Sequence, residues 1–443
     1  MNHLDRLSDL IAHARAAGAD AADALLVAGT SLSVTRRLGK TEHVERSEGQ
    51  DLGLRVFIGK QAAIVSATSI DPAGFAGLAE RAVAMAKVVP EDPYAGLADT
   101  AAPPESSQYL DMEDPSEPSA EDLIARAATA EEAALAVPGV TNSEGADAGF
   151  SRGEIYLVTS AGFAGHRVGT SHSISATALV GEGTGMQRDY DYDSKVYLAD
   201  LDDPAAIGRS AANRALARLN PTRPKTAKLP VVYDPRVATS LLGSLMGAIN
   251  GASVARGTSF LKEKLGQKIF ASGIFVRDDP RRVRGPRSRV FDGEGTPTKA
   301  RALIEDGVLT TWLLDSRSAR QLGMVSTGHA ARSTSGPPSP SASNLWLAAG
   351  TVTPAELMAD IKLGLYITEM MGGGVNGVTG DYSRGAAGFM IRDGKLAEAV
   401  AEITVAGHAL EMFATMTPAN DLVFRRGTDS PTVRVEGLTM AGA

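Results

Sequence analysis

Two clusters of proline divide this chain and limit what can fold on either side of them. Six prolines lie between residues 90 and 118 among Asp, Glu and Ser, and two more lie at Pro221 and Pro224. Proline fixes φ and lacks a backbone donor, so neither stretch continues a helix or a central strand. Such composition is typical of linkers. We therefore expect three segments in the 443 residues: 1–115, 116–224 and 225–443.

Each of the first two segments shows helix patterns beside strand patterns. Apolar residues three and four apart between Leu4 and Ala14 predict a helix, and Asp71-Pro72 starts another. A capping box at Ser119 and Asp122 predicts a helix to about Leu135. Residues 205–219 predict the last helix of the second segment. Strands are expected over residues 31–37, 53–58, 61–66, 155–160, 165–179 and 186–198.

The third segment is dominated by short strand patterns separated by glycine. Strand 229–233 precedes a helix that begins at Asp234-Pro235, and a second helix is expected over Pro354–Met371. The fold class is therefore α+β: helix-plus-sheet N-terminal and middle domains, followed by a β-rich C-terminal domain with two helices.

Composition excludes several classes of protein. The absence of cysteine excludes disulfides, cysteine-ligated zinc, iron–sulfur clusters and a cysteine nucleophile. A formal net charge of −8 argues against a nucleic-acid binder. No run of about 18 apolar residues predicts a membrane span. The N-terminus also lacks a signal-peptide pattern, so we expect a cytoplasmic protein.

Two glycine patterns resemble phosphate-binding loops but lack their context. Gly372, Gly374 and Gly377 match G-x-G-x-x-G, yet the pattern follows an expected helix instead of opening one. It therefore predicts a turn from helix to strand. Gly53 to Lys60 has one residue too many for a P-loop and predicts a hairpin.

Three charged patterns admit a functional and a structural interpretation. Asp189, Asp191 and Asp193 would share one strand face, where they could hold a hard cation, but a solvated face with buried tyrosines is favoured. Six arginines within residues 277–289 could bind an acidic partner, although a solvated loop is favoured. His166 and His172 could face one metal, but ordinary β-face histidines are favoured.

Residues 372–389, with the sequence GGGVNGVTGDYSRGAAGF, resemble the signature of the TldD/PmbA family. Three further stretches are similar to this family in the same order along the chain. They are FDGEG at 291–295, STGH at 326–329 and EITVAG at 402–407. The resemblance extends more weakly over the first two segments, so it covers nearly the whole chain.

The TldD branch of this family carries H-E-x-x-x-H on a helix early in the third segment, where it binds zinc. Between Pro235 and Lys262 this chain has no His, Asp or Glu. The corresponding helix carries Leu241, Leu245 and Ile249, which we expect on a buried face. The resemblance is therefore to the PmbA branch, also called TldE.

The resemblance implies a non-catalytic subunit of a cytoplasmic zinc peptidase. No cofactor is expected in this chain, and zinc is expected in a TldD-like partner. The substrate would be a peptide or an unfolded protein, in peptide maturation or in the degradation of unstable proteins. A homo-oligomer of the isolated chain stays open. A self-sufficient hydrolase around Asp381, Ser383 and Arg384, or a scaffold without protease, are the alternatives.

Five glycines within residues 372–380 predict a surface that another backbone can approach closely. An extended peptide could add there as a strand, with neighbouring polar side chains supplying hydrogen bonds. A structural turn in which Arg384 pairs with Asp381 is the competing interpretation. The candidate residues for the substrate path are Gly372, Gly373, Gly374, Asn376, Asp381, Ser383 and Arg384.

Overall fold

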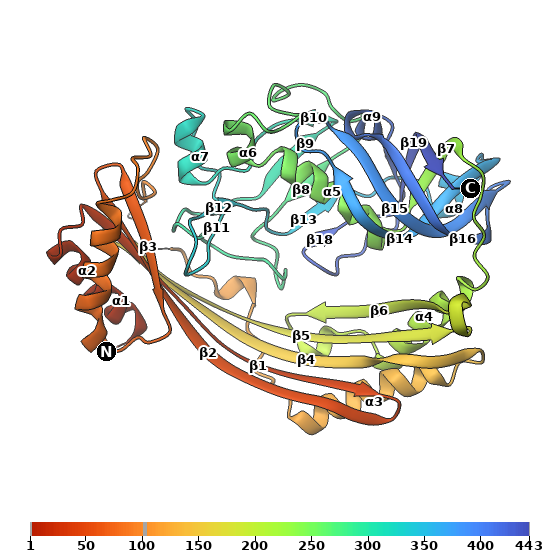
Figure 1. The fold of residues 1–443 in the computed structure, drawn as a ribbon, viewed down its shortest axis with the longest axis horizontal. Coiled ribbons are helices and arrows are strands. Elements are labelled where there is room, and N and C mark those ends of the chain that lie inside the picture. The colour runs from red at the N-terminus through yellow and green to blue at the C-terminus, as the bar shows by residue number, and fades with distance from the viewer. Residues whose placement is uncertain (1, 101–103, 443) are drawn as a thin grey trace.

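A long curved sheet lies opposite a β-rich C-terminal body in the computed structural model, which describes residues 2–100 and 104–442. Figure 1 shows the sheet below and the C-terminal body above it. Helices and strands are mixed throughout, and the C-terminal part is rich in strands. The expected α+β class is confirmed.

The long sheet is continuous across the first two segments of the chain. Its strand order is β3-β2-β1-β4-β5-β6, and every neighbouring pair is antiparallel. Because β1 pairs with β4 over fourteen residue pairs from Asp23↔Thr159 to Arg36↔Ala146, the two segments share one sheet. The strands are β1 (Ala21–Arg37), β2 (Lys40–Ile58), β3 (Gln61–Ala67), β4 (Val140–Thr159), β5 (Ala164–Val180) and β6 (Gln187–Lys195). The expected hairpin at Gly53 to Lys60 is confirmed as the β2–β3 turn.

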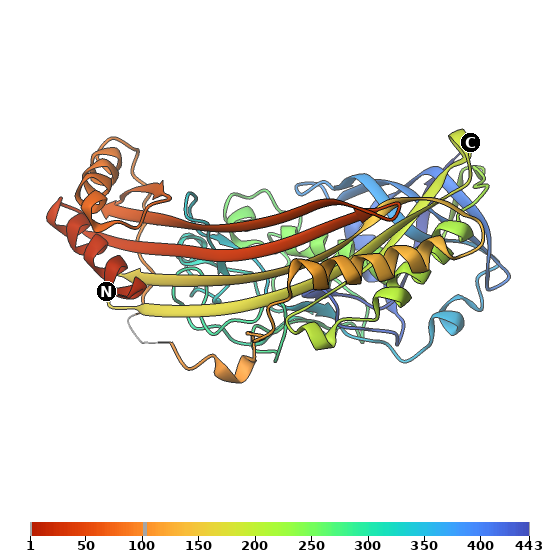
Figure 2. The same cartoon turned by 90° about the horizontal axis from the view of Figure 1, so that it is seen from below.

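Four helices cover the two ends of one face of this sheet (Figure 2). They are α1 (His3–Ala16), α2 (Phe75–Ala86), α3 (Ala120–Leu135) and α4 (Pro204–Ala217). Ala22, Ala24 and Leu26 of β1 pack with α1 and α2, whereas Val34 packs with α3 and α4. Side chains alternate between faces along a strand, so these even-numbered residues lie on the same face. The expected capping box of α3 at Ser119 and Asp122 forms.

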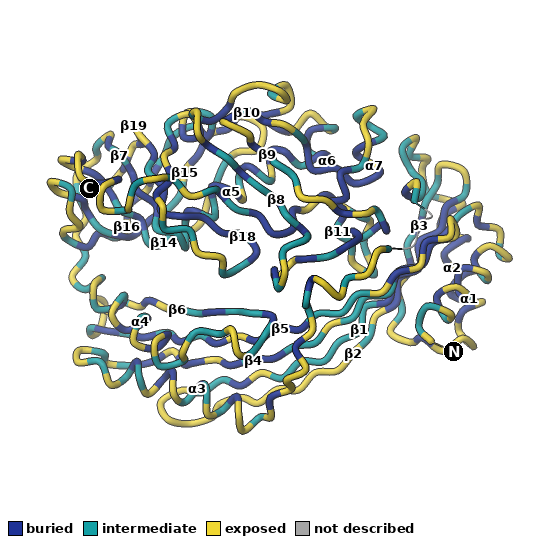
Figure 3. The backbone as a smooth tube through the Cα atoms, turned by 180° about the vertical axis from the view of Figure 1, so that it is seen from behind, coloured by how far each residue is buried: buried dark blue, intermediate teal, exposed yellow. Residues whose placement is uncertain are grey.

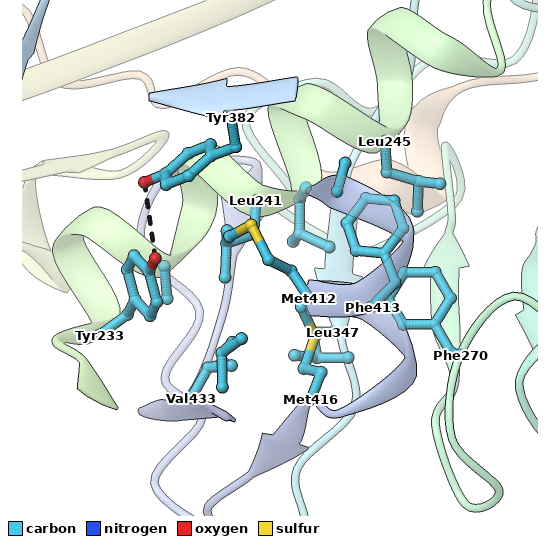
Figure 4. Close-up of a cluster of buried hydrophobic side chains, with 14 of the residues drawn as sticks. Tyr233, Leu241, Leu245, Phe270, Leu347, Tyr382, Met412, Phe413, Met416 and Val433 are labelled. Atoms are coloured by element: carbon cyan, nitrogen blue, oxygen red, sulfur yellow. Dashed lines mark hydrogen bonds between the residues drawn. The ribbon is translucent and has the colours of Figure 1, made fainter. Parts of the chain in front are cut away.

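A small barrel forms the core of the C-terminal body. The sheet order β16-β15-β14-β7-β19, with an additional β16–β19 pairing, closes these strands on themselves. Helices α5 (Pro235–Ala248) and α9 (Ala409–Ala414) pack on the apolar core around them. Figure 4 shows Leu241 and Leu245 of α5 beside Met412 and Phe413 of α9. The strands are β7 (Ala227–Tyr233), β14 (Leu363–Val375), β15 (Asp381–Arg392), β16 (Lys395–His408) and β19 (Val433–Ala441).

Shorter elements surround the barrel. A second sheet has the order β10-β9-β8-β13-β18, and β11 pairs with β12. The strands are β8 (Val276–Asp278), β9 (Arg301–Glu305), β10 (Val308–Leu309), β11 (Ala330–Ala331), β12 (Ser339–Pro340), β13 (Leu345–Leu347), β17 (Thr417–Pro418) and β18 (Thr428–Asp429). The helices are α6 (Gly251–Ala255), α7 (Ser316–Gln321) and α8 (Pro354–Met358), with 3-10 turns at Pro72–Gly74, Gln108–Leu110, Gly183–Gly185 and Leu198–Asp200.

The helix expected over Pro354–Met371 is wrong. Helix α8 ends at Met358, and β14 begins at Leu363. Residues 365–367 pair with both β7 and β15, so two neighbouring strands override the helical spacing of the apolar residues. The glycines at 372–374 therefore end a strand, and the expected helix-to-strand turn does not exist. The C-terminal body holds five helices in its described residues instead of two: α5, with 14 residues, and the short helices α6 to α9.

The first proline-rich stretch packs against the C-terminal body. Leu110 is fully buried, and its carbonyl accepts from the Arg284 amide at 2.8 Å. Arg320 of α7 donates to the carbonyls of Tyr94 and Gly96. Pro103, which belongs to this stretch, lies outside the described residues. The stretch connects the first two segments along the chain and also contacts the C-terminal body.

Candidate functional site

The seven residues expected on the substrate path lie together at one end of the β14–β15 hairpin. Residues 372–374 end β14, residues 381–384 begin β15, and Asn376 lies in the loop between them. Five of the seven residues are exposed: Gly372, Gly373, Asn376, Asp381 and Ser383. The other two, Gly374 and Arg384, are half-buried. The sequence interpretation therefore groups these residues as the fold does.

Two of the seven side chains hold the hairpin loop in place. The Asn376 side chain accepts from the amides of Val378 and Thr379 at 2.9 and 3.2 Å. The Asp381 carboxylate accepts from the Thr379 hydroxyl at 2.6 Å. The Phe260 amide also donates to the Gly377 carbonyl at 2.8 Å, which fastens the loop to its neighbour. The side chains of Asn376 and Asp381 thus stabilise the turn through hydrogen bonds.

The three glycines form an irregular step in β14. The register with β15 shifts between Met371 and Gly374, and the φ angles of Gly372 and Gly373 are +58° and +41°. A Cβ on Gly373 would lie 2.1 Å from the Ser383 carbonyl oxygen, so the absence of a side chain here allows β15 to lie this close to β14. A Cβ on Gly372 or Gly374 would meet nothing within 4 Å.

Arg384 supports this step directly. Its Nε donates to the Gly372 carbonyl at 3.1 Å. The ion pair between Arg384 and Asp381 that the sequence also admitted does not form among the described residues. The Ser383 hydroxyl likewise has no hydrogen bond to a histidine or carboxylate in the described part of the chain. This hairpin thus offers surface and backbone, without a nucleophile and base in contact.

One side of β14 lacks a neighbouring strand beyond Ile367. Strand β7 pairs only with residues 365–367, and no other described strand pairs with β14 on that side. We call residues 369–375 the open edge. Helix α5 contacts β14, and its Gly243 and Gly247 are exposed. The opposite face of α5 carries Leu241 and Leu245, which are 4% and 0% exposed; their expected burial is confirmed, as is that of Ile249.

The acidic face expected to be solvated is buried, and that expectation is wrong. Asp189, Asp191 and Asp193 are 4%, 6% and 1% exposed, whereas Tyr190 is 39% exposed. Each carboxylate faces a cation, which for Asp189 and Asp191 comes from another element and for Asp193 from the same strand. The pairs are Asp189 with Arg236 and Arg218, Asp191 with Arg214, and Asp193 with Lys195. Each of these carboxylates is therefore paired with an arginine or lysine side chain.

The arginine-rich loop at residues 277–289 is also not simply solvated. Arg284 lies against the Tyr197 ring and bonds to Asp111 at 2.7 Å and Asp200 at 2.9 Å. Arg282 lies 3.7 Å from the centroid of the Phe424 ring. Several of these arginines thus bind the first proline-rich stretch and the loop before β18.

His166 and His172 occupy different environments, which agrees with ordinary β-face histidines. His172 is fully buried and lies 3.1 Å from Asp114, and burial lowers its pKa although Asp114 acts in the opposite direction. His166 is partly exposed, stacks on Tyr156 at 4.2 Å and lies 3.3 Å from Glu154. Among the residues that the structure describes, no three His, Asp or Glu side chains gather as a metal site.

A buried chain of hydrogen bonds was missed by the sequence interpretation. His329 lies between Asp278 at 3.1 Å and the Thr327 hydroxyl at 2.8 Å, which resembles the order of a catalytic triad. All three residues are at most 6% exposed, and the Thr327 hydroxyl accepts from the Leu314 amide at 2.7 Å. No reacting group can reach it, so the network is structural. The STGH stretch was the available signal.

A second missed cluster joins the long sheet to the C-terminal body. Asp23 and Arg55 of neighbouring strands bond at 3.0 Å, and Arg332 reaches Asp23 at 2.6 Å. Arg55 and Glu294 also line a cavity of about 730 Å³ between the two halves. Nearby, burial raises the pKa of Asp292 to about 7, and the charge of Glu294 acts in the same direction. The contact between the long sheet and the C-terminal body is therefore ionic as well as apolar.

Three family models match successive parts of the chain. The PmbA/TldA metallopeptidase domain 1 matches residues 22–86, the central domain matches 113–219 and the C-terminal domain matches 226–442. In the described part of the chain, no helix is both long and apolar enough to cross a bilayer.

Similar proteins agree with these models. The chain is 36% identical to the metalloprotease PmbA of Escherichia coli O157:H7, over 96% of the chain and 92% of that protein. It is 31% identical to a PmbA homologue of Haemophilus influenzae, over 93% of the chain and 90% of that protein.

Solved structures share the fold over the whole length. A proposed modulator of DNA gyrase from Bacteroides thetaiotaomicron superposes with a TM-score of 0.90 at 26% identity, covering 99% of this chain and 98% of that one. TldE from Thermococcus kodakarensis gives a TM-score of 0.86 at 20% identity, covering 99% and 100%. The chain therefore belongs to the PmbA/TldD metallopeptidase family, in its PmbA (TldE) branch.

Proposed function

We propose that this chain is the non-catalytic subunit of a cytoplasmic TldD–TldE-type zinc peptidase and contributes to the path of the peptide substrate. The observation that carries the proposal is the composition of α5. In the TldD branch, the corresponding helix is expected to carry the zinc ligands, whereas residues 235–262 here contain no His, Asp or Glu. A catalytic zinc site needs about three protein ligands and a general base. The zinc and the hydrolysis would then come from the partner.

The open edge supports a role in holding peptide. Residues 369–375 expose one side of a strand, and an extended peptide can satisfy such backbone groups by adding a further strand. Gly372 and Gly374 leave space for another backbone to approach. Binding through the backbone tolerates many side chains, which suits a subunit that handles peptides or unfolded proteins of varied sequence.

The test combines this chain with a TldD-like catalytic subunit encoded in the same genome. We expect the catalytic subunit to cleave an extended peptide well only when this chain is present. The isolated chain, exposed to zinc and then dialysed, should retain no stoichiometric zinc by elemental analysis. One tightly held zinc per chain, or full cleavage by this chain alone, would favour the self-sufficient hydrolase and overturn the proposal.

Two variants examine the open edge itself. Gly374→Val places a branched side chain beside it, and Arg384→Ala removes the bond to the Gly372 carbonyl. Arg392→Ala is the matched control, because Arg392 lies at the other end of β15 and pairs with Glu398 on the surface. We expect both test variants to associate with the partner normally and to reduce cleavage, with the control unaffected. Undiminished cleavage by both would exclude this edge from the substrate path.

A further inference from the structure

The open edge is anchored at its first residue by a partly buried ion network, in which the Glu369 side chain is 27% exposed. Glu369 bonds through Oε2 to Nη2 of Arg218, the residue that caps the C-terminus of α4. Arg218 Nη1 also lies 3.6 Å from Asp189 Oδ2 on β6. The side chains of Arg218 and Asp189 are 11% and 4% exposed. A strand of the C-terminal barrel is thus tied to the middle of the chain.

The same carboxylate reaches the helix on the other side of the open edge. Asp189 Oδ1 lies 2.8 Å from Nη1 of Arg236, in the first turn of α5. Arg236 is 7% exposed at its side chain and also donates to the Tyr190 carbonyl at 3.1 Å. The network therefore runs from β14 through α4 and β6 to α5, and it joins the strand that carries the open edge to the helix beside it.

The position of Glu369 within β14 gives the anchor its effect. The register with β15 shifts between Ile367 and Glu369, and shifts again between Met371 and Gly374. Only residues 369–371 pair regularly between these two irregularities. Bulges bend and twist a strand locally, so the barrel alone does not fix the direction in which residues 372–374 leave it. A charged bond at residue 369 restrains that direction.

We propose that Arg218 and Glu369 are positioning residues that fix where the open edge lies relative to α5. The middle segment of the chain, which carries Arg218, would then determine how a peptide is held. The inference rests on the proposed function, since it assumes that the open edge receives peptide. Losing Arg218 leaves Asp189 paired with Arg236, so the buried Asp189 carboxylate keeps a cationic partner.

The absence of cysteine allows a direct test on this chain alone. Val378 is 61% exposed in the hairpin loop, so Val378→Cys can carry a nitroxide spin label. We expect Arg218→Met and Glu369→Gln each to increase the mobility of this label. Arg209→Met is the matched control, because Arg209 lies on the same helix and pairs with Asp203 at the surface. Equal spectra for all four proteins would overturn the inference.

Cleavage with the catalytic partner supplies the second readout. A lost positioning contact should raise KM by about 2- to 30-fold with kcat and association nearly unchanged, and Arg218→Lys should recover part of the loss. A fall in cleavage without a change in label mobility would also overturn the inference, because the effect would not pass through the hairpin. If the unmodified chain fails to stimulate the partner, the proposed function fails, while the label still decides whether the anchor exists. Should Arg218→Met not fold, Glu369→Gln decides alone.

Discussion

Asp292 lies near the contact between the long sheet and the C-terminal body, where its surroundings favour the protonated carboxyl. It is 1% exposed, and its two oxygens accept from the amides of Glu294, Thr296 and Ala330 at 2.9 to 3.0 Å. These donors favour the ionised form, yet burial and the neighbouring Glu294 outweigh them and raise the pKa of Asp292 to about 7. In the folded chain Asp292 therefore keeps its proton at pH values up to about 7.

This proton makes stability depend on pH. Between the ordinary aspartate pKa near 3.8 and about 7, the folded chain keeps a proton that the unfolded chain releases. The free energy of unfolding should thus fall as pH rises through this range, by at most about 1.4 kcal/mol per pH unit from this group. We expect Asp292→Asn to lack this component in urea unfolding between pH 4 and 7. Asp393→Asn, on an exposed turn, is the control, and identical slopes for all three proteins would contradict the prediction.

Single residues also show where sequence patterns stop being informative. Leu241 and Leu245 are buried as expected because they belong to the apolar stripe of their own helix, which the spacing of apolar residues in the sequence reveals. Asp189 and Asp191 are buried against expectation, because Arg236 and Arg214 reach them from other elements. A run of alternating acids is typical of a solvated face until such distant cations are placed beside it. The pattern alone contains no signal for these partners.

At the scale of elements, the C-terminal hairpin shows the same dependence on context. Pro354 starts a helix as expected, but α8 ends after five residues and β14 follows. The run Tyr366-Ile367-Thr368 was the available signal, since aromatic and β-branched residues favour strands. The site residues at 372–384 could nevertheless be grouped from sequence, because glycine clusters and turn residues act locally. Their open edge could not, since it depends on where β7 stops pairing.

Two neighbouring glycines of this hairpin should respond differently to alanine. At Gly373 a Cβ would lie 2.1 Å from the Ser383 carbonyl, so Gly373→Ala must separate the two strands. At Gly372 a Cβ meets nothing within 4 Å, and its φ of +58° lies in the left-handed region that alanine enters at a cost of about 1–2 kcal/mol. We expect hydrogen exchange of the Ser383 and Arg384 amides to accelerate much more in Gly373→Ala. Equal acceleration in both would contradict the register of β14 and β15.

At the scale of the whole molecule, the two halves are joined at both ends of the long sheet. Asp23, Arg55 and Arg332 meet at one end, and Asp189 with Arg218 and Arg236 meets at the other. By contrast, residues 40–49 of β2 are exposed throughout, as Figure 3 shows along the outer hairpin. Buried ionic groups at both ends of the sheet thus join the halves, in addition to the apolar contacts between them.

Removing Asp23 should therefore destabilise the assembly of the two halves. Asp23→Asn leaves Arg55 and Arg332 buried with a weaker acceptor, and breaking a buried ion pair on one side costs about 3–5 kcal/mol. Lys362→Met is the control, because Lys362 pairs with Asp393 in solvent, where an ion pair contributes about 0–1 kcal/mol. Thermal unfolding of both variants measures the difference. An Asp23→Asn midpoint equal to that of the control would show that this cluster does not hold the halves together.

The barrel is completed by the last strand of the chain. Strand β19 (Val433–Ala441) lies between β7 and β16, so it supplies the pairing that closes the ring. During synthesis on a ribosome, β7 therefore emerges some two hundred residues before the strand that covers its edge. Until β19 has been synthesised, β7 and β16 each present one unpaired backbone edge to other nascent chains. The C-terminal body can therefore close only after β19 has been synthesised.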